Sequence, residues 1–183
     1  MSSHDRTIHN LALAGFMGTG KTSVGRLVAG LLHFEFVDTD EMIEAQTGRR
    51  IAQIFAEDGE PAFRQIESEM VRQLHGRRNL VISTGGGLIL NQQNLDSLKE
   101  HAWVVCLWAS PETIFHRIRN QTHRPLLQCP DPLARIRELL AERDFAYRQA
   151  DMLLNCEARP LREMASHLAY QFRAVLSPTE TPS

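Results

Sequence analysis

Five short apolar segments recur along the chain, separated by longer stretches with helical periodicity. The segments are LALA from position 11, FEFVD from 34, LVIST from 80, WVVCLW from 103 and DMLLNC from 151. Such runs are typical of buried strands, and the patterns between them predict helices over about 20–32, 91–100, 111–119, 133–147 and 161–175. Strands joined by helices of this length run mostly parallel. The pattern therefore predicts an α/β fold in which a five-stranded parallel sheet lies between two layers of helices.

Two intervals do not fit a plain alternation of strand and helix. The stretch from Asp38 to Asn79 is too long for one crossover helix, so we expect a helical insertion at about 38–75. Within it Gly48 and Gly59 suit helix ends, and Pro61 suits the first turn of the next helix.

The second interval is RNQTHRPLLQCPDP at 119–132, which contains three prolines and no clear period. It is predicted to be a long loop, and long loops in compact domains often form lids. We expect a single domain over 1–175, with the lid at about 117–132 and a disordered tail at 176–183.

The composition excludes several classes of protein. Of the 183 residues 43% are hydrophobic, and the formal net charge of -2 provides no basic field for a polynucleotide. Cys106, Cys129 and Cys156 show no CxxC spacing, which argues against a disulfide framework or a zinc site. No signal-peptide pattern and no membrane-length apolar run is present. We expect a cytoplasmic protein without a nucleic-acid or membrane partner.

The sequence GFMGTGKT at 15–22 follows the first predicted strand and opens a helix. It fits the pattern GxxxxGK followed by Ser or Thr, which is the phosphate-binding loop. Glycines let backbone N–H groups approach a phosphate chain, and the helix N-terminus adds a favourable dipole. We expect Lys21 to reach the outer phosphates and the Thr22 hydroxyl to bind Mg²⁺. The predicted ATP-binding residues of the loop are Gly15, Gly18, Thr19, Gly20, Lys21, Thr22 and Ser23.

The loop alone does not separate a GTPase, an ATP-driven machine and a kinase. No NKxD stretch is present for reading guanine, and the chain leaves little room for the extra domains of a motor. A small ATP-dependent kinase is therefore the favoured class.

Candidate acceptor residues follow the second and third predicted strands. Asp38 and Asp40 come at the carboxyl end of the second strand, where ligands bind in open α/β sheets. In an extended chain they point to opposite sides, so we expect Asp38 to face Mg²⁺ and Asp40 to face an acceptor hydroxyl as general base or hydrogen-bond partner. Capping of the next helix is the alternative role for both carboxylates. Gly85, Gly86 and Gly87 follow the third strand and permit close approach of a ligand.

Four arginines complete the set of candidates. Arg64 and Arg143 lie on predicted helices and would suit a carboxylate on the acceptor, although either one alone also fits a solvated surface charge. Arg124 in the predicted lid would stabilise charge on the transferred phosphoryl group, and Arg117 would lie against the adenine.

Taken in order, GFMGTGKTSVGR, DTDEMIE, GRRIAQIFAEDGEPAFRQIE, STGGG, RPLL and Arg143 closely resemble the shikimate kinase family. The resemblance covers about residues 9–156. It implies a nucleoside-monophosphate-kinase-like P-loop fold, and phosphorylation of the 3-hydroxyl of shikimate by ATP in chorismate and aromatic amino-acid biosynthesis. Kinases of this type resemble monomers, so a monomer is expected.

The resemblance also assigns roles to individual residues. Lys21 and Thr22 would serve the phosphates and Mg²⁺, with Asp38 on the metal side. Shikimate would be held by Asp40, Arg64, Gly86 and Arg143, and the lid and nucleotide-side arginines match Arg124 and Arg117. The segment 143–147 reads RDFAY, where the family usually shows Arg-x-Pro-Leu-Tyr. That departure puts the contact of Arg143 in question.

Two other functions compete with this interpretation. The residues by themselves indicate only a small, carboxylated and hydroxylated acceptor, so a kinase for another hydroxy acid such as gluconate is an alternative. A nucleotide-binding module that has lost phosphoryl transfer is the second alternative, supported only by the altered segment around Arg143.

Overall fold

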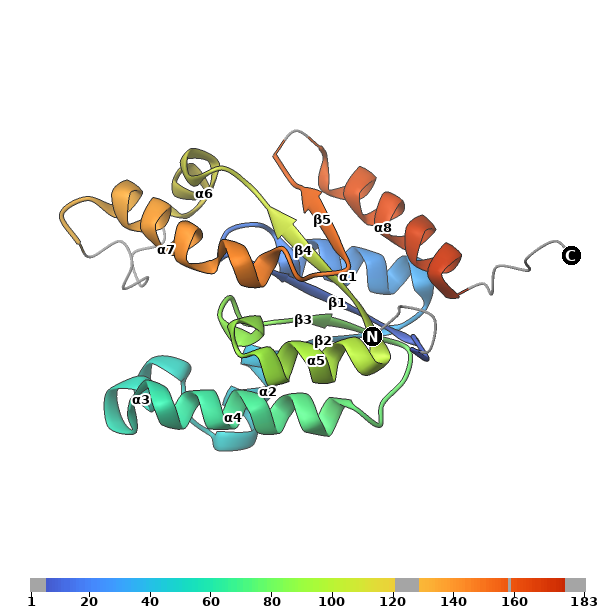
Figure 1. Ribbon diagram of the computed structural model, residues 1–183, viewed down its shortest axis with the longest axis horizontal. Coiled ribbons are helices and arrows are strands. Elements are labelled where there is room, and N and C mark those ends of the chain that lie inside the picture. The colour runs from blue at the N-terminus through green and yellow to red at the C-terminus, as the bar shows by residue number, and fades with distance from the viewer. Residues whose placement is uncertain (1–5, 121–128, 158, 177–183) are drawn as a thin grey trace, which may run out of the picture.

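A five-stranded, fully parallel sheet forms the centre of the computed structural model, which describes residues 6–120, 129–157 and 159–176 (Figure 1). Its strand order is β2-β3-β1-β4-β5. The strands are β1 (Asn10–Gly15), β2 (Glu35–Asp38), β3 (Leu80–Ser83), β4 (Ala102–Trp108) and β5 (Met152–Asn155). All five apolar segments of the sequence are thus strands, and the predicted parallel sheet is confirmed.

Helices connect the strands and cover both faces of the sheet. They are α1 (Lys21–Leu32), α2 (Thr39–Thr47), α3 (Ile51–Glu57), α4 (Gly59–Leu74), α5 (Gln92–His101), α6 (Pro111–Ile118), α7 (Pro132–Tyr147) and α8 (Leu161–Leu176), with a 3₁₀ turn at Leu88–Leu90. Helices α1 and α8 pack together on one face, while α5 and α7 lie over the other (Figure 1). Among the described helices none is long and apolar enough to cross a membrane.

The main core is formed by the three central strands and the helices against them. Every residue of β1 and β3 is buried, because both strands have neighbours on each side and helices on each face. Strand β4 is buried except near its two ends, at Trp103 and Trp108. The ring of Trp103 lies 6.3 Å from that of Phe172 in α8, whereas Trp108 at the carboxyl end is 44% exposed.

The predicted helical insertion is α2, α3 and α4, and it has a small apolar cluster of its own. Ile43, Ile54, Phe63 and Met70 are buried together, one or two from each helix. Gly48 ends α2 in the left-handed conformation with φ 68°, and Gly59 turns the chain between α3 and α4 with φ 81°. The insertion therefore has an apolar cluster of its own, and Val71 and Leu74 of α4 also join it to the main core.

A buried polar cluster lies at the opposite, amino edge of the sheet. The Asn10 amide donates to the Arg77 carbonyl at 2.8 Å and lies 2.9 Å from Nδ1 of His101, and its oxygen accepts from the Leu80 N–H at 2.9 Å. Asn10 and His101 are almost completely buried. This amide joins the start of β1 to the start of β3 and to the end of α5.

Candidate active site

The loop between β1 and α1 wraps around the ammonium group of Lys21. Nζ of Lys21 donates to the carbonyl oxygens of Gly15 at 2.9 Å and Phe16 at 3.0 Å, and therefore lies inside the curve of the loop. Gly15 has φ 127°, and a side chain there would collide with the Leu107 carbonyl oxygen of β4. Gly20 has φ 92° immediately before α1. Glycines are thus required at both ends of the loop, as a phosphate-binding turn demands.

The hydroxyl of Thr22 and the carboxylate of Asp38 meet beside this loop. Thr22 Oγ1 donates to Asp38 Oδ2 at 3.1 Å, and the other oxygen of Asp38 accepts from the N–H of Asp40 at 3.1 Å. Asp38 is therefore the N-cap of α2 as well as a neighbour of Thr22. Asp40 lies in the first turn of α2 and not in a strand, so the expected extended geometry of this pair is wrong.

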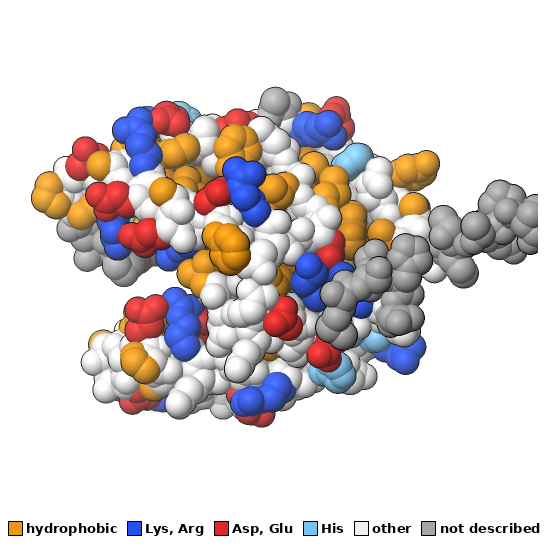
Figure 2. Space-filling model, viewed as in Figure 1, with side chains coloured by type: hydrophobic (Ala, Val, Ile, Leu, Met, Phe, Trp, Pro, Cys, Tyr) orange, Lys and Arg blue, Asp and Glu red, His pale blue; other side chains and the backbone are white. Residues whose placement is uncertain are grey.

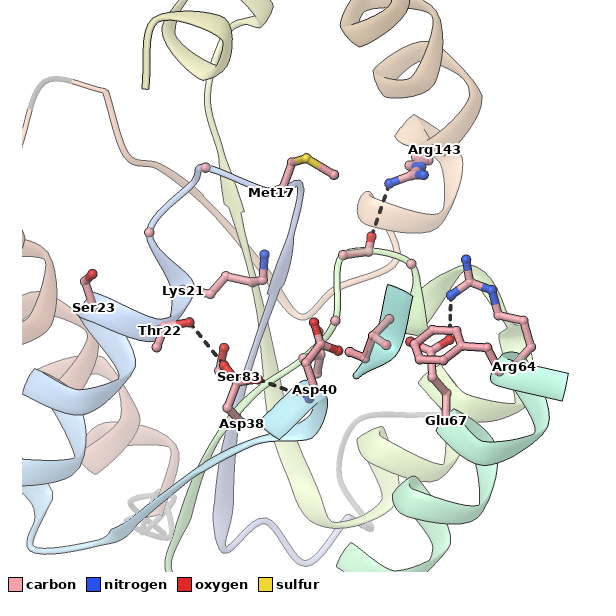
Figure 3. A pocket seen from close by; sticks show the side chains of 18 of the residues that line it. Met17, Lys21, Thr22, Ser23, Asp38, Asp40, Arg64, Glu67, Ser83 and Arg143 are labelled. Carbon is pink, nitrogen blue, oxygen red and sulfur yellow. Dashed lines mark hydrogen bonds and ion pairs between the residues drawn. The ribbon is translucent and has the colours of Figure 1, made fainter. Parts of the chain in front are cut away.

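A cavity of about 540 Å³ opens between the phosphate-binding loop, the insertion and α7. Figure 2 shows the surface hollowed between the side formed by α3 and α4 and the side formed by α7. The charged residues in its wall are Lys21, Asp38, Asp40, Arg64, Glu67, Arg117 and Arg143. Figure 3 shows Lys21 and Asp38 toward one end, Arg64 and Glu67 toward the other, and Asp40 between them. The volume suits a small polar ligand.

The guanidinium of Arg64 is held by two carboxylates of its own helix. Its Nε and Nη2 donate to Oε1 of Glu60, at 3.2 and 2.8 Å, and its Nη1 donates to Oε2 of Glu67 at 2.5 Å. Both pairs follow from helical spacing, at i,i+4 and i,i+3. The Glu67 side chain is only 1% exposed, whereas Glu60 is 62% exposed. Burial raises the pKa of Glu67, Asp40 and Glu60 add to the rise, and Arg64 opposes it.

The three glycines after β3 leave room for charged groups on both sides. A side chain at Gly85 would lie 2.6 Å from Oδ1 of Asp40 and 3.0 Å from Oε1 of Glu67. One at Gly87 would lie 2.8 and 2.9 Å from Nη1 and Nη2 of Arg64. Protein side chains therefore already lie against this loop, where sequence reasoning expected a ligand. A larger residue at Gly85 or Gly87 would displace those side chains.

Helix α7 contacts the middle glycine of the same loop. The Tyr147 hydroxyl donates to the Gly86 carbonyl at 3.0 Å, and Arg143 Nη1 approaches that oxygen at 3.5 Å. Burial raises the pKa of Tyr147 to about 12, so the phenol stays protonated and remains a donor. The guanidinium of Arg143 also lies over the Phe16 ring, at 5.1 Å from its centroid. The unusual RDFAY segment nevertheless brings Arg143 to the cavity, because α7 continues without a break to Tyr147.

Arg117 joins the phosphate-binding loop to the segment after β5. Its guanidinium donates to the Cys156 carbonyl at 2.7 Å and to the Gly18 carbonyl at 3.3 Å. The arginine therefore lies beside the phosphate-binding loop in the wall of the cavity, and its contact with adenine stays a prediction. Arg124 lies outside the described residues.

Most of the predicted site residues share this one cavity. Its wall contains Gly18, Gly20, Lys21, Thr22, Ser23, Asp38, Asp40, Arg64, Gly85, Gly86, Gly87, Arg117 and Arg143. Gly15 and Thr19 do not line it: Gly15 ends β1, and Thr19 is buried with its hydroxyl donating to the Phe16 carbonyl. Sequence reasoning assigned no role to Glu67 or Tyr147. Their spacing from Arg64 and Arg143, three and four positions along the same helices, is the signal that points to them.

Comparison with known proteins identifies the family. A family model described as shikimate kinase matches residues 17–172. A shikimate kinase of Thermodesulfovibrio yellowstonii is 45% identical over 89% of this chain and 94% of its own length. The chain belongs to the shikimate kinase family. A second shikimate kinase, from Pelotomaculum thermopropionicum, is 46% identical over 88% of this chain and 94% of that protein.

Solved structures agree with the family assignment. The shikimate kinase of Acinetobacter baumannii in complex with shikimate superposes with a TM-score of 0.85 at 37% identity, over 96% of this chain and 97% of that one. A gluconokinase of Sinorhizobium meliloti has a TM-score of 0.57 at 16% identity, over 94% of this chain and 99% of that one, which is a likeness of fold alone. The P-loop kinase fold implied by the sequence motifs is confirmed. The sequence identity to the shikimate kinases is much higher than the identity to the gluconokinase.

Proposed function

We propose that this protein transfers the γ-phosphoryl group of ATP to the 3-hydroxyl of shikimate, giving shikimate 3-phosphate and ADP. The observation that carries the proposal is the shared cavity, in which a phosphate-binding loop and two arginines suited to a carboxylate face one another. Membership of the shikimate kinase family supports the choice of acceptor. The reaction belongs to chorismate and aromatic amino-acid biosynthesis.

The phosphate-binding loop is proposed to hold the nucleotide. Its N–H groups and the N-terminus of α1 would receive the phosphates, and Lys21 would leave its loop carbonyls for the outer phosphate oxygens. Thr22 and Asp38 offer a hydroxyl and a carboxylate oxygen 3.1 Å apart, which fits a hard divalent cation such as Mg²⁺. When bound, Mg²⁺ neutralises charge on the phosphates. Arg117 is proposed to lie against the adenine.

The other end of the cavity is proposed to hold the acid. Arg64 and Arg143 would bind the shikimate carboxylate, and the backbone of Gly85–Gly87 would support the ring from the sheet side. Asp40 stands between this end and Lys21, where the acceptor hydroxyl must lie for transfer (Figure 3). We assign Asp40 as the general base or orienting group.

The proposed step is an in-line displacement. The 3-hydroxyl oxygen forms a bond to the γ-phosphorus while the bond from phosphorus to the β–γ bridging oxygen breaks, and the hydroxyl proton passes to Asp40. Lys21 compensates charge on the transferred group. Positioning of the two substrates in one cavity supplies most of the acceleration. The lid arginine Arg124 is expected from the sequence to assist at the same stage.

The decisive test is ADP release by the purified protein with ATP and Mg²⁺, measured with shikimate, with gluconate and with no acceptor. Release that requires shikimate is the expected result. Faster release with gluconate would favour a kinase for a different hydroxy acid. Nucleotide binding with no acceptor-dependent release would instead indicate a module that has lost phosphoryl transfer.

Four further properties stay predictions from the sequence. We propose that the protein acts in the cytoplasm, that it is a monomer, that residues 38–75 form the substrate-binding part of a single domain, and that residues 117–132 form its lid. Light scattering coupled to gel filtration measures the molar mass in solution, and a mass of twice 20.8 kDa would contradict the monomer.

A further inference from the structure

Three carboxylates lie at the acceptor end of the cavity. Glu60 and Glu67 pair with Arg64, and the oxygens of Asp40 and Glu67 both lie close to Gly85. A carboxylate acceptor brings a further negative charge to this place. Carboxylates that lie close together in a partly buried cavity are costly to ionise, because water screens their charges poorly.

Among these three carboxylates, the ionised form of Glu67 is the least stabilised by its surroundings. Its side chain is almost completely buried, and Asp40 approaches the same face of Gly85 from α2. Its ionisation depends on one strong contact, the 2.5 Å hydrogen bond from Arg64. Glu60 in contrast is mostly exposed, so water stabilises its charge.

Arg64 is also the group that an acceptor carboxylate would bind. Of its five N–H groups three already donate to Glu60 and Glu67, which leaves one on Nη1 and one on Nη2. Both atoms border Gly87 in the cavity wall. A carboxylate placed on these two donors shares the guanidinium charge with Glu67 and lies within a few ångströms of it.

On this basis, and resting on the proposed function, we infer that Glu67 takes up a proton from solvent when a carboxylate acceptor binds Arg64. The proton offsets the charge that the acceptor brings. Asp40 then remains the ionised carboxylate at the acceptor, as its role in the reaction requires.

Glu67 differs from the ionisable groups around it in its burial and in its dependence on Arg64. The ionisable groups around Glu67 are Arg64 and Glu60 from α4, Asp40 from α2, Arg143 from α7 and Lys21 from α1, while α3 contributes only Ile51 and Phe55. The cations among them do not take up a proton near neutral pH. Burial already raises the pKa of Glu67, and a second carboxylate on Arg64 raises it further.

The test is calorimetric titration of the full-length protein with shikimate at pH 6, 7 and 8, at each pH in two phosphate-free buffers that differ in their heat of ionisation. The difference in heat between buffers gives the number of protons bound. We expect uptake of up to one proton per shikimate in the wild type, and a dissociation constant that rises by up to about tenfold per pH unit where uptake is complete. Glu67→Gln should abolish both the uptake and the pH dependence, whereas Glu60→Gln, which touches the same arginine from solvent, should keep them.

Two results overturn the inference: shikimate binding without proton uptake in the wild type, or equal uptake in the Glu67→Gln variant. If that variant does not fold, an infrared difference spectrum of the wild type decides, since a new carboxylic acid carbonyl band must appear on binding. Absence of both shikimate binding and shikimate-dependent ADP release would overturn the proposed function as well. Binding and turnover without uptake would overturn the proton uptake alone.

Discussion

The orientation of the Arg64 guanidinium is fixed by neighbouring carboxylates. Glu60 and Glu67 lie on either side of it along α4, and together they fix the plane of the guanidinium. A single ammonium group has no such plane and cannot present two parallel donors. The geometry of the fork, and not the positive charge alone, therefore determines how a carboxylate is held.

We predict that Arg64→Lys raises the KM for shikimate by at least about tenfold and lowers kcat much less, since it removes a charge-assisted bidentate contact. Steady-state kinetics with saturating ATP measures both constants. Arg72→Lys, at an exposed position of the same helix, is the matched control and should leave them unchanged. An unchanged KM in Arg64→Lys would rule out a role in binding the carboxylate.

Asp40 is predicted to act on the hydroxyl and not on the nucleotide. Asp40→Asn keeps the size of the side chain and should lower kcat by about 10² to 10⁴, as expected for the loss of a general base. Binding of ATP, followed by calorimetry, should stay within a few-fold of wild type. Glu41→Gln alters the exposed neighbour and serves as control. Turnover within a few-fold of wild type would exclude Asp40 as base.

Connections between elements depend on a few buried polar groups. Asn10 bridges β1, β3 and α5 through three contacts, all below 3.0 Å. Asn10→Ala would leave the Leu80 N–H and the Arg77 carbonyl without that partner in a dry environment. We predict a loss of about 3 kcal/mol in the free energy of unfolding, measured by urea titration.

The matched control for Asn10 is Gln92→Ala, which removes an amide from an exposed helical pair with Asp96. It should change the unfolding free energy by less than about 0.5 kcal/mol. Because Asn10 lies at the edge of the sheet opposite the cavity, folded Asn10→Ala should keep its KM for shikimate. A loss of stability no larger than in the control would show that the Asn10 hydrogen bonds add nothing.

The strands and most helices follow from local patterns, and this is why they could be predicted from the sequence. Apolar runs between turn residues mark the strands, and the spacing of glycines and Pro61 marks the insertion. The loop residues from Gly15 to Thr22 are recognisable because backbone shape and chemistry depend on the same short segment.

Other features of the site depend on contacts between distant segments and carry no local signal. Asp38 both caps α2 and meets Thr22, although sequence reasoning treated these as competing roles. Glu67 lies beside Gly85 and Asp40, which come from other segments of the chain. Likewise the Gly86 carbonyl and the Tyr147 hydroxyl of α7 come from distant segments, and their hydrogen bond forms only in the folded protein.

Acid should weaken the folded state through a group that lies away from the cavity. Burial, together with the nearby His75 and His9, lowers the pKa of His101 to about 4. Between pH 6.5 and 4, His101 is therefore protonated in the unfolded chain but not in the folded chain. The free energy of unfolding consequently falls as the pH falls. The carboxyl groups of Asp151 and Glu157, whose pKa values are depressed by hydrogen bonds, lose their contributions at still lower pH.

We predict that the unfolding free energy decreases from pH 7 to pH 4, with a contribution on the order of 3 kcal/mol from His101. Urea titrations across this range measure it. His101→Gln is expected to flatten the profile above pH 4, while His116→Gln on α6 should leave its slope unchanged. A profile equally steep in His101→Gln would assign the loss of stability to other groups.

The two tryptophans stand near opposite ends of β4, and this gives the protein a built-in optical signal. Trp103 packs near Phe172 at the end remote from the cavity, while Trp108 is exposed at the carboxyl edge of the sheet, close to α6 and α7. Indole emission responds to the water around the ring. A Trp103→Phe variant would thus retain one fluorophore, and movement of α6 or α7 on binding ATP or shikimate would register as a change in emission without any attached dye.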